Sequence, residues 1–127
     1  MIELSFDKIK ALHHLLAAET GGPVAMKDEG LLTSAIEEKF ETVDGHELYP
    51  TIEEKAAKLG HSIIVNHAYF DGNMRLGMLA MLTLLEVNGI KLSCSNDDIA
   101  KAGKAVKAGK MSYEQLRKWI EKHKAFG

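Results

Sequence analysis

Residues 59–87 read LGHSIIVNHAYFDGNMRLGMLAMLTLLEV, and this stretch decides the fold. Its outer parts, Leu59–Val65 and Leu76–Val87, are the most apolar segments of the chain. Its middle, Asn66–Arg75, places an imidazole, a carboxylate, an amide and a guanidinium around one glycine. Polar groups between two core segments lower stability unless they are paired, so their presence here indicates that they serve a function. We therefore expect the rest of the chain to support this turn.

The segment before the turn has the signals of a helix. Thr51 and Glu54 have the spacing of a capping box, and an apolar stripe at helical intervals follows them. The stripe consists of Ile52, Ala56, Leu59 and Ile63. This pattern predicts a helix that runs to about His67.

The segment after the turn predicts a second, more deeply buried helix. Asn73 stands where an N-cap belongs, and Leu76–Val87 is apolar almost all the way round, which is typical of a helix at the centre of a bundle. Asn88-Gly89 is a C-cap signal that ends it.

Cap signals divide the rest of the chain into further helices, which begin at Ser5, Asp28, Ser95 and Ser112. Gly21-Gly22-Pro23 ends the first of them, in which we expect His13 to be partly buried, His14 to be solvated and neither to take part in chemistry. The buried face predicted for the second comprises Leu31, Leu32, Ala35, Ile36 and Phe40. The sequence predicts an all-α fold: one domain, residues 1–127, forming a bundle of about six helices.

Helical periodicity lapses between Thr42 and Pro50. Asp44-Gly45 is a turn signal, and alternation of Val43, His46 and Leu48 around it would allow a small hairpin. On this stretch alone, a connecting loop is the favoured interpretation.

Composition and charge narrow the class of protein. The 127 residues carry 16 basic and 18 acidic side chains, a net charge of -2, which gives no general attraction to nucleic acid or to anionic lipid. Cys94 is the single cysteine, so no internal disulfide can form. We expect no signal peptide and no membrane segment, because the longest apolar run is too short to span a bilayer. These features indicate a cytoplasmic protein.

The turn has the residue types that phosphate chemistry needs. Gly72 permits positive φ close to a helix N-terminus, where backbone N–H groups bind phosphate, and Arg75 can hold phosphate oxygens with its forked guanidinium. Asp71 offers a hard oxygen ligand for Mg²⁺, and His67 could accept a proton from a hydroxyl. This combination predicts attack of a hydroxyl group on a nucleotide phosphate.

Each of these residues also has a purely structural interpretation. His67 could be a satisfied core histidine, Asp71-Gly72-Asn73 an ordinary turn, and Arg75 an ion-pair partner of Asp71. A zinc site formed by His61, His67 and Asp71 is a further alternative, although its spacing matches no standard zinc pattern.

The segment His67–Arg75, HAYFDGNMR, resembles the Fic/Doc signature H-P-F-x-[D/E]-G-N-[G/K]-R. Residues 28–32, 34–35, 47–51 and 54–57, together with Asn88-Gly89 and the closing helix, are also similar to the death-on-curing (Doc) proteins. The resemblance covers essentially the whole chain, whose length is that of the small Doc toxins.

The resemblance implies an all-α bundle with the motif loop between two central helices and a flap within Thr42–Tyr49, which favours the hairpin there. Fic proteins transfer AMP from ATP to a target hydroxyl. Doc toxins transfer a phosphate, inactivate elongation factor Tu and are neutralised by a Phd-type antitoxin. The site residues implied by position are His67 as base, Asp71 as Mg²⁺ ligand, Gly72, Asn73 and Arg75 as phosphate binders, and Tyr69 as the aromatic loop anchor.

The chain departs from the signature at several positions. Met74 stands where Gly is typical of AMP transfer and Lys of Doc proteins, so the residue that would separate the two chemistries does not do so. Ala68 replaces Pro, and Leu76-Gly77 replaces the Thr-Ala usual in Doc proteins. The family's self-inhibitory pattern, [S/T]-x-x-x-E-[G/N], has its nearest approach at Ser34–Glu38, where Lys39 breaks the match.

Four functions therefore compete. The leading hypothesis is a Doc-like toxin that transfers phosphate from Mg·ATP to a hydroxyl of elongation factor Tu, with AMP transfer as the alternative reaction. Met74 supports a catalytically weakened nucleotide- or partner-binding module. A row of lysines at intervals of three (Lys101, Lys104, Lys107 and Lys110) could contact nucleic acid, but a solvated face is the favoured interpretation. The same stripe could instead help to dock an acidic partner.

Overall fold

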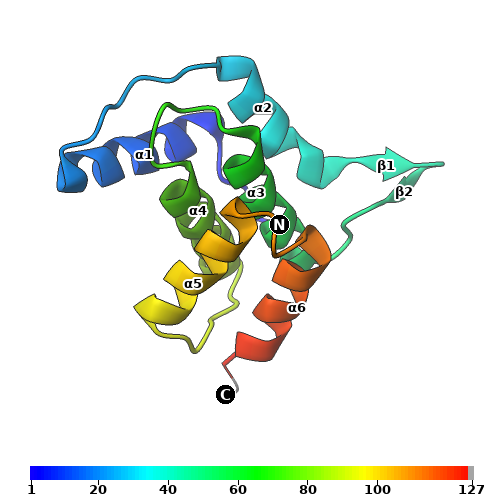
Figure 1. Ribbon diagram of the computed structural model, residues 1–127. Helices are drawn as coiled ribbons and strands as arrows, with labels where there is room; N and C mark the ends of the chain where they lie inside the picture. The colour runs from blue at the N-terminus through cyan, green and yellow to red at the C-terminus, as the bar shows by residue number, and fades with distance from the viewer. Residues whose placement is uncertain (126–127) are drawn as a thin grey trace.

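The computed structural model describes residues 1–125, which form six α-helices and a short hairpin (Figure 1). The helices are α1 (Phe6–Thr20), α2 (Glu29–Glu37), α3 (Ile52–Asn66), α4 (Asn73–Val87), α5 (Asn96–Lys107) and α6 (Tyr113–His123). A 3-10 turn, η1 (Glu38–Phe40), and two strands, β1 (Thr42–Val43) and β2 (His46–Glu47), lie between α2 and α3. The predicted all-α class and helix count are confirmed.

The centre of the molecule is the antiparallel pair α3 and α4. Helices α1 and α5 pack against α4, and α2 and α6 pack against α3. The backbones of the central pair approach closely because each has a glycine at the crossing: a Cβ added at Gly77 would lie 2.7 Å from the carbonyl oxygen of Gly60. The side chains buried around this crossing include Leu59, Ile63, Leu76, Met81, Leu84 and Leu85.

Helices α1, α2, α3, α5 and α6 begin at the predicted caps. In each of five helices the side chain of the capping residue accepts a hydrogen bond from the N–H three residues on; these caps are Ser5, Asp28, Thr51, Ser95 and Ser112. The boxes at Ser95 and Ser112 are reciprocal. The box at Thr51 is not, because the Thr51 hydroxyl donates to the Glu54 carboxylate at 2.9 Å.

The predicted buried face of α2 is wrong at its end. The helix stops at Glu37, and the tighter winding of η1 turns Phe40 outward, where it is 45% exposed. Lys39 is buried in its place. Its Nζ forms an ion pair with Glu3 at 2.8 Å and donates to the Ile36 carbonyl.

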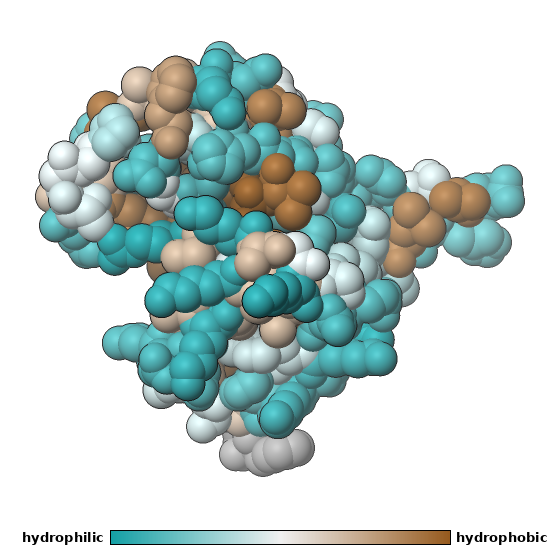
Figure 2. All heavy atoms as spheres, viewed as in Figure 1, coloured by the Kyte–Doolittle hydropathy of each residue, from teal (hydrophilic) through white to brown (hydrophobic). Residues whose placement is uncertain are grey.

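The segment after η1 forms the hairpin, so the favoured loop interpretation is wrong. Strands β1 and β2 are antiparallel, and Asp44 and Gly45 connect them with φ of 52° and 79°. The hairpin projects from the body and carries exposed apolar side chains, Val43 and Leu48 (Figures 1 and 2). The ammonium group of Lys55 fastens its base to α3 by bonds to Glu47 at 2.9 Å and to the Tyr49 carbonyl.

No helix within residues 1–125 combines the length and the apolar character needed to cross a bilayer.

Candidate active site

The motif loop, residues 67–72, joins the C-terminus of α3 to the N-terminus of α4. His67 and Gly72 are left-handed, with φ of 57° and 83°, and reverse the chain between two helices that lie side by side. The segment before α2 holds the loop from outside. The N–H groups of Lys27 and Asp28 both donate to the Ala68 carbonyl, at 2.8 and 3.0 Å, and Met26 pairs with Tyr69 in an isolated antiparallel bridge.

Tyr69 and Asn73 hold the loop from inside. Tyr69 is 1% exposed and Asn73 is 4% exposed. The Asn73 side chain accepts from the Tyr69 N–H at 3.0 Å and donates to the Tyr69 carbonyl at 2.8 Å. Asn73 is therefore not the N-cap that the sequence predicted. Gly72 takes that position without a side-chain bond, and Asn73, the first helical residue, turns its amide back to brace the loop.

A histidine of α1 completes this support. The His13 ring stacks on the Tyr69 ring, with 3.5 Å between centroids and 12° between planes, and its Nε2 lies 2.9 Å from the Asp71 carbonyl oxygen. Helical spacing predicted the partial burial of His13 but no part in the site. The contact joins residues 58 positions apart, so no local pattern could reveal it.

Asp71, Gly72 and Arg75 line one small hollow against the end of α1, with a volume of about 110 Å³. The Leu76 N–H donates to the Gly72 carbonyl at 2.9 Å, so helical bonding starts there. The N–H groups of residues 73–75 consequently have no acceptor inside α4 and present the positive end of its dipole. A hollow of this size accommodates a phosphate group but not a whole nucleotide, for which pockets measure about 300–1,000 Å³.

The charged side chains of the hollow are exposed and available to a ligand. Asp71 Oδ1 accepts from the Gly72 N–H at 2.8 Å, and the guanidinium of Arg75 lies 4.0 Å from Glu19. Arg75 therefore takes Glu19 as its ion-pair partner among residues 1–125, not Asp71 as the structural alternative had it. An anion could replace so distant and exposed a partner at little cost.

His67 is exposed and does not line the hollow. Its Nδ1 lies 3.4 Å from Lys27 Nζ, so the neutral ring that accepts from this ammonium carries its hydrogen on Nε2. Proton abstraction by His67 requires Lys27 to leave Nδ1 or the ring to take its other tautomer. The zinc alternative is not supported: in the described part of the chain, no three His, Cys, Asp or Glu side chains form a possible metal site.

Met74 does not line the hollow. It lines a groove of about 500 Å³ between α1, α4 and α5, which shares Arg75 and Leu16 with the hollow. A Cβ added at Gly103 of α5 would lie 3.1 Å from Met74 Cγ. The methionine thus packs α5 onto α4, which gives a structural reason for an apolar side chain at this position.

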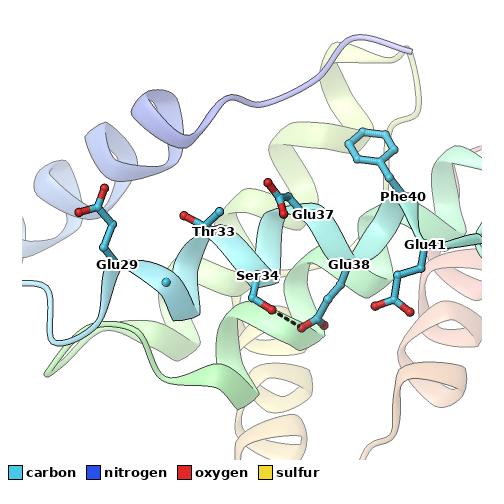
Figure 3. A pocket seen from close by; sticks show the side chains of 8 residues that line it. Glu29, Thr33, Ser34, Glu37, Glu38, Phe40 and Glu41 are labelled. Carbon is cyan, nitrogen blue, oxygen red and sulfur yellow. Dashed lines mark hydrogen bonds between the residues drawn. The ribbon is translucent and has the colours of Figure 1, made fainter.

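A second, acidic groove of about 750 Å³ runs along α2 and η1 (Figure 3). Within it the Glu38 carboxylate accepts from Ser34 at 3.0 Å, Ser62 at 2.6 Å and Asn66 at 3.4 Å. Burial raises the pKa of Glu38, but these hydrogen bonds and nearby Lys58 together lower it below its usual value. Glu38 is the glutamate of the Ser34–Glu38 segment that comes nearest to the self-inhibitory pattern. Its bonds to Ser62 and Asn66 attach it to α3.

The row of lysines is solvated. All four are exposed, and Lys101 forms an ion pair with Asp97 of its own helix at 3.0 Å. A solvated face explains these residues without a nucleic-acid ligand.

Comparison with known proteins agrees with the fold and the motif. A family model described as the Fic/DOC family matches residues 3–85. The chain therefore belongs to the Fic/Doc family. Within this family it is 40% identical over 77 residues to a protein named Toxin Doc from Mycolicibacterium smegmatis. That alignment covers 61% of this chain and 59% of the relative, so it spans about three fifths of the relative's length.

Proposed function

We propose that this protein is a Doc-like toxin that transfers the terminal phosphate of Mg·ATP to a hydroxyl group of a target protein, elongation factor Tu. The observation that carries the proposal is the hollow where Asp71, Arg75 and the open N-terminus of α4 meet. One carboxylate, one guanidinium and free backbone N–H groups suit a phosphate that carries a divalent cation.

The residues present also fit the implied Mg²⁺. Asp71 is an exposed hard-oxygen ligand, and Mg²⁺ is commonly held by one or two carboxylates together with substrate phosphates. When bound, the ion would neutralise the phosphate charge.

The chain's own residues divide the remaining work. Arg75 and the N–H groups at the start of α4, that of Asn73 included, bind phosphate oxygens. Gly72 contributes backbone to the wall of the hollow, and Tyr69 anchors the loop. His67 accepts the proton of the target hydroxyl as its oxygen bonds to phosphorus and the bond from phosphorus to the ADP oxygen breaks.

Transfer of AMP is the second candidate reaction. The position of Met74 is the observation that keeps this reaction open. This side chain lines the α4–α5 groove and adds no charge to the hollow. Because Met74 stands where the Doc proteins have lysine, this positive charge is missing from the site. The orientation of the nucleotide then depends on the other residues of the hollow.

Isotope labelling of ATP distinguishes transfer of phosphate from transfer of AMP. Purified protein is incubated with Mg²⁺, elongation factor Tu and ATP labelled at either the γ- or the α-phosphate. Label from the γ position alone supports phosphate transfer, and label from the α position supports AMP transfer. If neither label is transferred to the target, and expression of the protein causes no growth defect, the proposal that the protein is an enzyme is rejected.

His67→Ala distinguishes the enzyme from a binding module, with His14→Ala, at an exposed histidine of α1, as its control. Loss of a general base lowers the rate by about 10²–10⁴-fold, so we expect this variant to lose toxicity. A non-catalytic module predicts an unchanged phenotype.

We further propose that the protein acts in the cytoplasm and is neutralised by a Phd-type antitoxin in trans. The broken self-inhibitory pattern supports inhibition by another chain, because Lys39 follows Glu38 where the pattern needs Gly or Asn. Coexpression with the product of the neighbouring open reading frame tests this proposal. Unrelieved toxicity contradicts it.

A further inference from the structure

His13 contacts the motif loop with both the face and the edge of its ring. The face stacks on Tyr69, and Nε2 lies 2.9 Å from the Asp71 carbonyl oxygen. The ring is 2% exposed, and a Cβ added at Gly72 would lie 3.3 Å from Nε2. A buried imidazole therefore occupies the space beside Gly72 and lines the hollow together with Asp71 and Arg75.

The bond has a defined direction. A carbonyl oxygen only accepts hydrogen bonds, so Nε2 of His13 must carry the hydrogen and donate it to Asp71. His13 is thus the donor in a buried bond between α1 and the motif loop.

We propose that His13 is a positioning residue that holds the Asp71–Gly72 peptide in one orientation. This inference rests on the function proposed above. The peptide is gripped at both ends: its carbonyl oxygen accepts from His13, and its N–H donates to Asp71 Oδ1 at 2.8 Å. A rotation of this peptide would break both bonds.

Such a grip matters because the peptide precedes a glycine. A flip of the peptide plane mainly changes ψ of Asp71 and φ of Gly72, and glycine accepts positive and negative φ about equally. Gly72 has φ of 83°, and its carbonyl starts the hydrogen bonding of α4. Without the His13 donor, the Asp71 carboxylate and the first turn of α4 would sample a second arrangement. In that arrangement the Asp71 carboxylate and the N–H groups of α4 would no longer point into the hollow.

Two substitutions separate donation from packing. His13→Phe keeps an aromatic ring against Tyr69 but cannot donate. His13→Gln restores an N–H donor near the position of Nε2 but loses the ring. The exposed neighbour supplies matched controls, His14→Phe and His14→Gln.

The variants are compared by thermal unfolding, by kcat and KM for Mg·ATP in transfer to elongation factor Tu, and by the NMR line width of the Gly72 amide. Loss of a residue that supports a metal ligand lowers affinity or activity by about 10–100-fold, and we expect His13→Phe to lose kcat/KM in this range while it stays folded. Its Gly72 amide should broaden through exchange. His13→Gln should recover most of the activity, and both His14 variants should match the wild type.

Wild-type kcat/KM together with a sharp Gly72 signal in His13→Phe would overturn the inference. If His13→Phe does not fold, His13→Gln decides: retained transfer supports the donor role, and lost transfer refutes it. If the wild type itself transfers nothing, the proposed function fails, and the Gly72 line width alone then decides whether His13 holds the peptide.

Discussion

Tyr69 carries a buried hydroxyl group without a hydrogen-bond partner in the described part of the chain. Its ring is buried and stacks on His13, while its backbone is bonded to the Asn73 side chain. Burial raises the pKa of the phenol, since the charged form is disfavoured away from water. Phenylalanine would supply the same ring without the polar atom.

We therefore expect Tyr69→Phe to increase the free energy of unfolding by about 1 kcal/mol, because an unsatisfied buried donor carries a desolvation cost of about 1–3 kcal/mol. Urea denaturation measures the change, and Tyr49→Phe, at a half-buried tyrosine, is the control. A loss of stability in Tyr69→Phe would reveal a partner for the hydroxyl.

Asn73 illustrates how a motif residue can act through the backbone. Removal of its amide in Asn73→Ala leaves the Tyr69 N–H and carbonyl unpaired in a buried position. We expect a loss of about 2–3 kcal/mol in the free energy of unfolding, at the upper end of the desolvation range for such groups. Asn96→Ala, at an exposed asparagine in the first turn of α5, should change it by no more than about 0.5 kcal/mol. Equal effects of the two substitutions would contradict the bracing role.

At the scale of elements, the crossing of α3 and α4 depends on small residues. A Cβ added at Gly77 would lie 2.5 Å from Ile64 Cγ1 and 2.7 Å from the Gly60 carbonyl oxygen, which cannot move without the helix. A Cβ at Gly103 would instead meet Met74 and Met78 at their flexible Cγ atoms, 3.1 and 3.0 Å away. The two helical glycines thus predict different responses to one added methyl group.

We expect Gly77→Ala to lose about 2 kcal/mol, because the cost of overpacking, about 1–3 kcal/mol, exceeds what alanine gains in helix propensity. Gly103→Ala, the matched control, should be close to neutral because the methionines can adjust. Thermal unfolding of both variants checks this. A neutral Gly77→Ala would mean that α3 and α4 can separate without loss.

Most elements could be predicted because their signals are local. A cap needs a side chain and an N–H three residues away, so Ser5, Asp28, Ser95 and Ser112 marked helix starts correctly. The prediction failed at Phe40, where the helix period was extended past the end of α2, and it placed the hairpin only with the help of the family resemblance. Short exposed strands of this kind have little apolar periodicity.

For the whole molecule, two carboxylates connect segments that are distant in the chain. Glu38 of η1 binds Ser62 and Asn66 of α3, and Glu53 of α3 pairs with Lys124 after α6. Burial raises the pKa of each carboxyl group. Hydrogen bonds and the neighbouring ammonium groups outweigh this effect, so the net pKa of each lies below its usual value. Both carboxylates are therefore held in their charged form by the fold.

The sign of the pH dependence follows. A carboxylate whose folded pKa is depressed stabilises the fold above its unfolded pKa, ordinarily 4.5, and this stability is lost as the pH falls through the folded pKa. We expect the free energy of unfolding to fall below about pH 5. Glu38→Gln should be less stable than the wild type at pH 7 and less sensitive to acid, whereas Glu41→Gln, at an exposed residue, should follow the wild type. An acid response unchanged by Glu38→Gln would assign it to other groups.

The sequence by itself determined the helices, the position of the motif loop between the two central ones and the family, because caps, periodicity and a contiguous motif are all encoded within a few neighbouring residues. Only the tertiary structure decided how the motif's side chains are used. It turned Asn73 inward, directed Met74 toward α5, placed Asp71 and Arg75 around one hollow and brought His13 beneath them. These arrangements depend on how α1 and α5 pack against α4, and such packing is set by contacts between residues far apart in the chain.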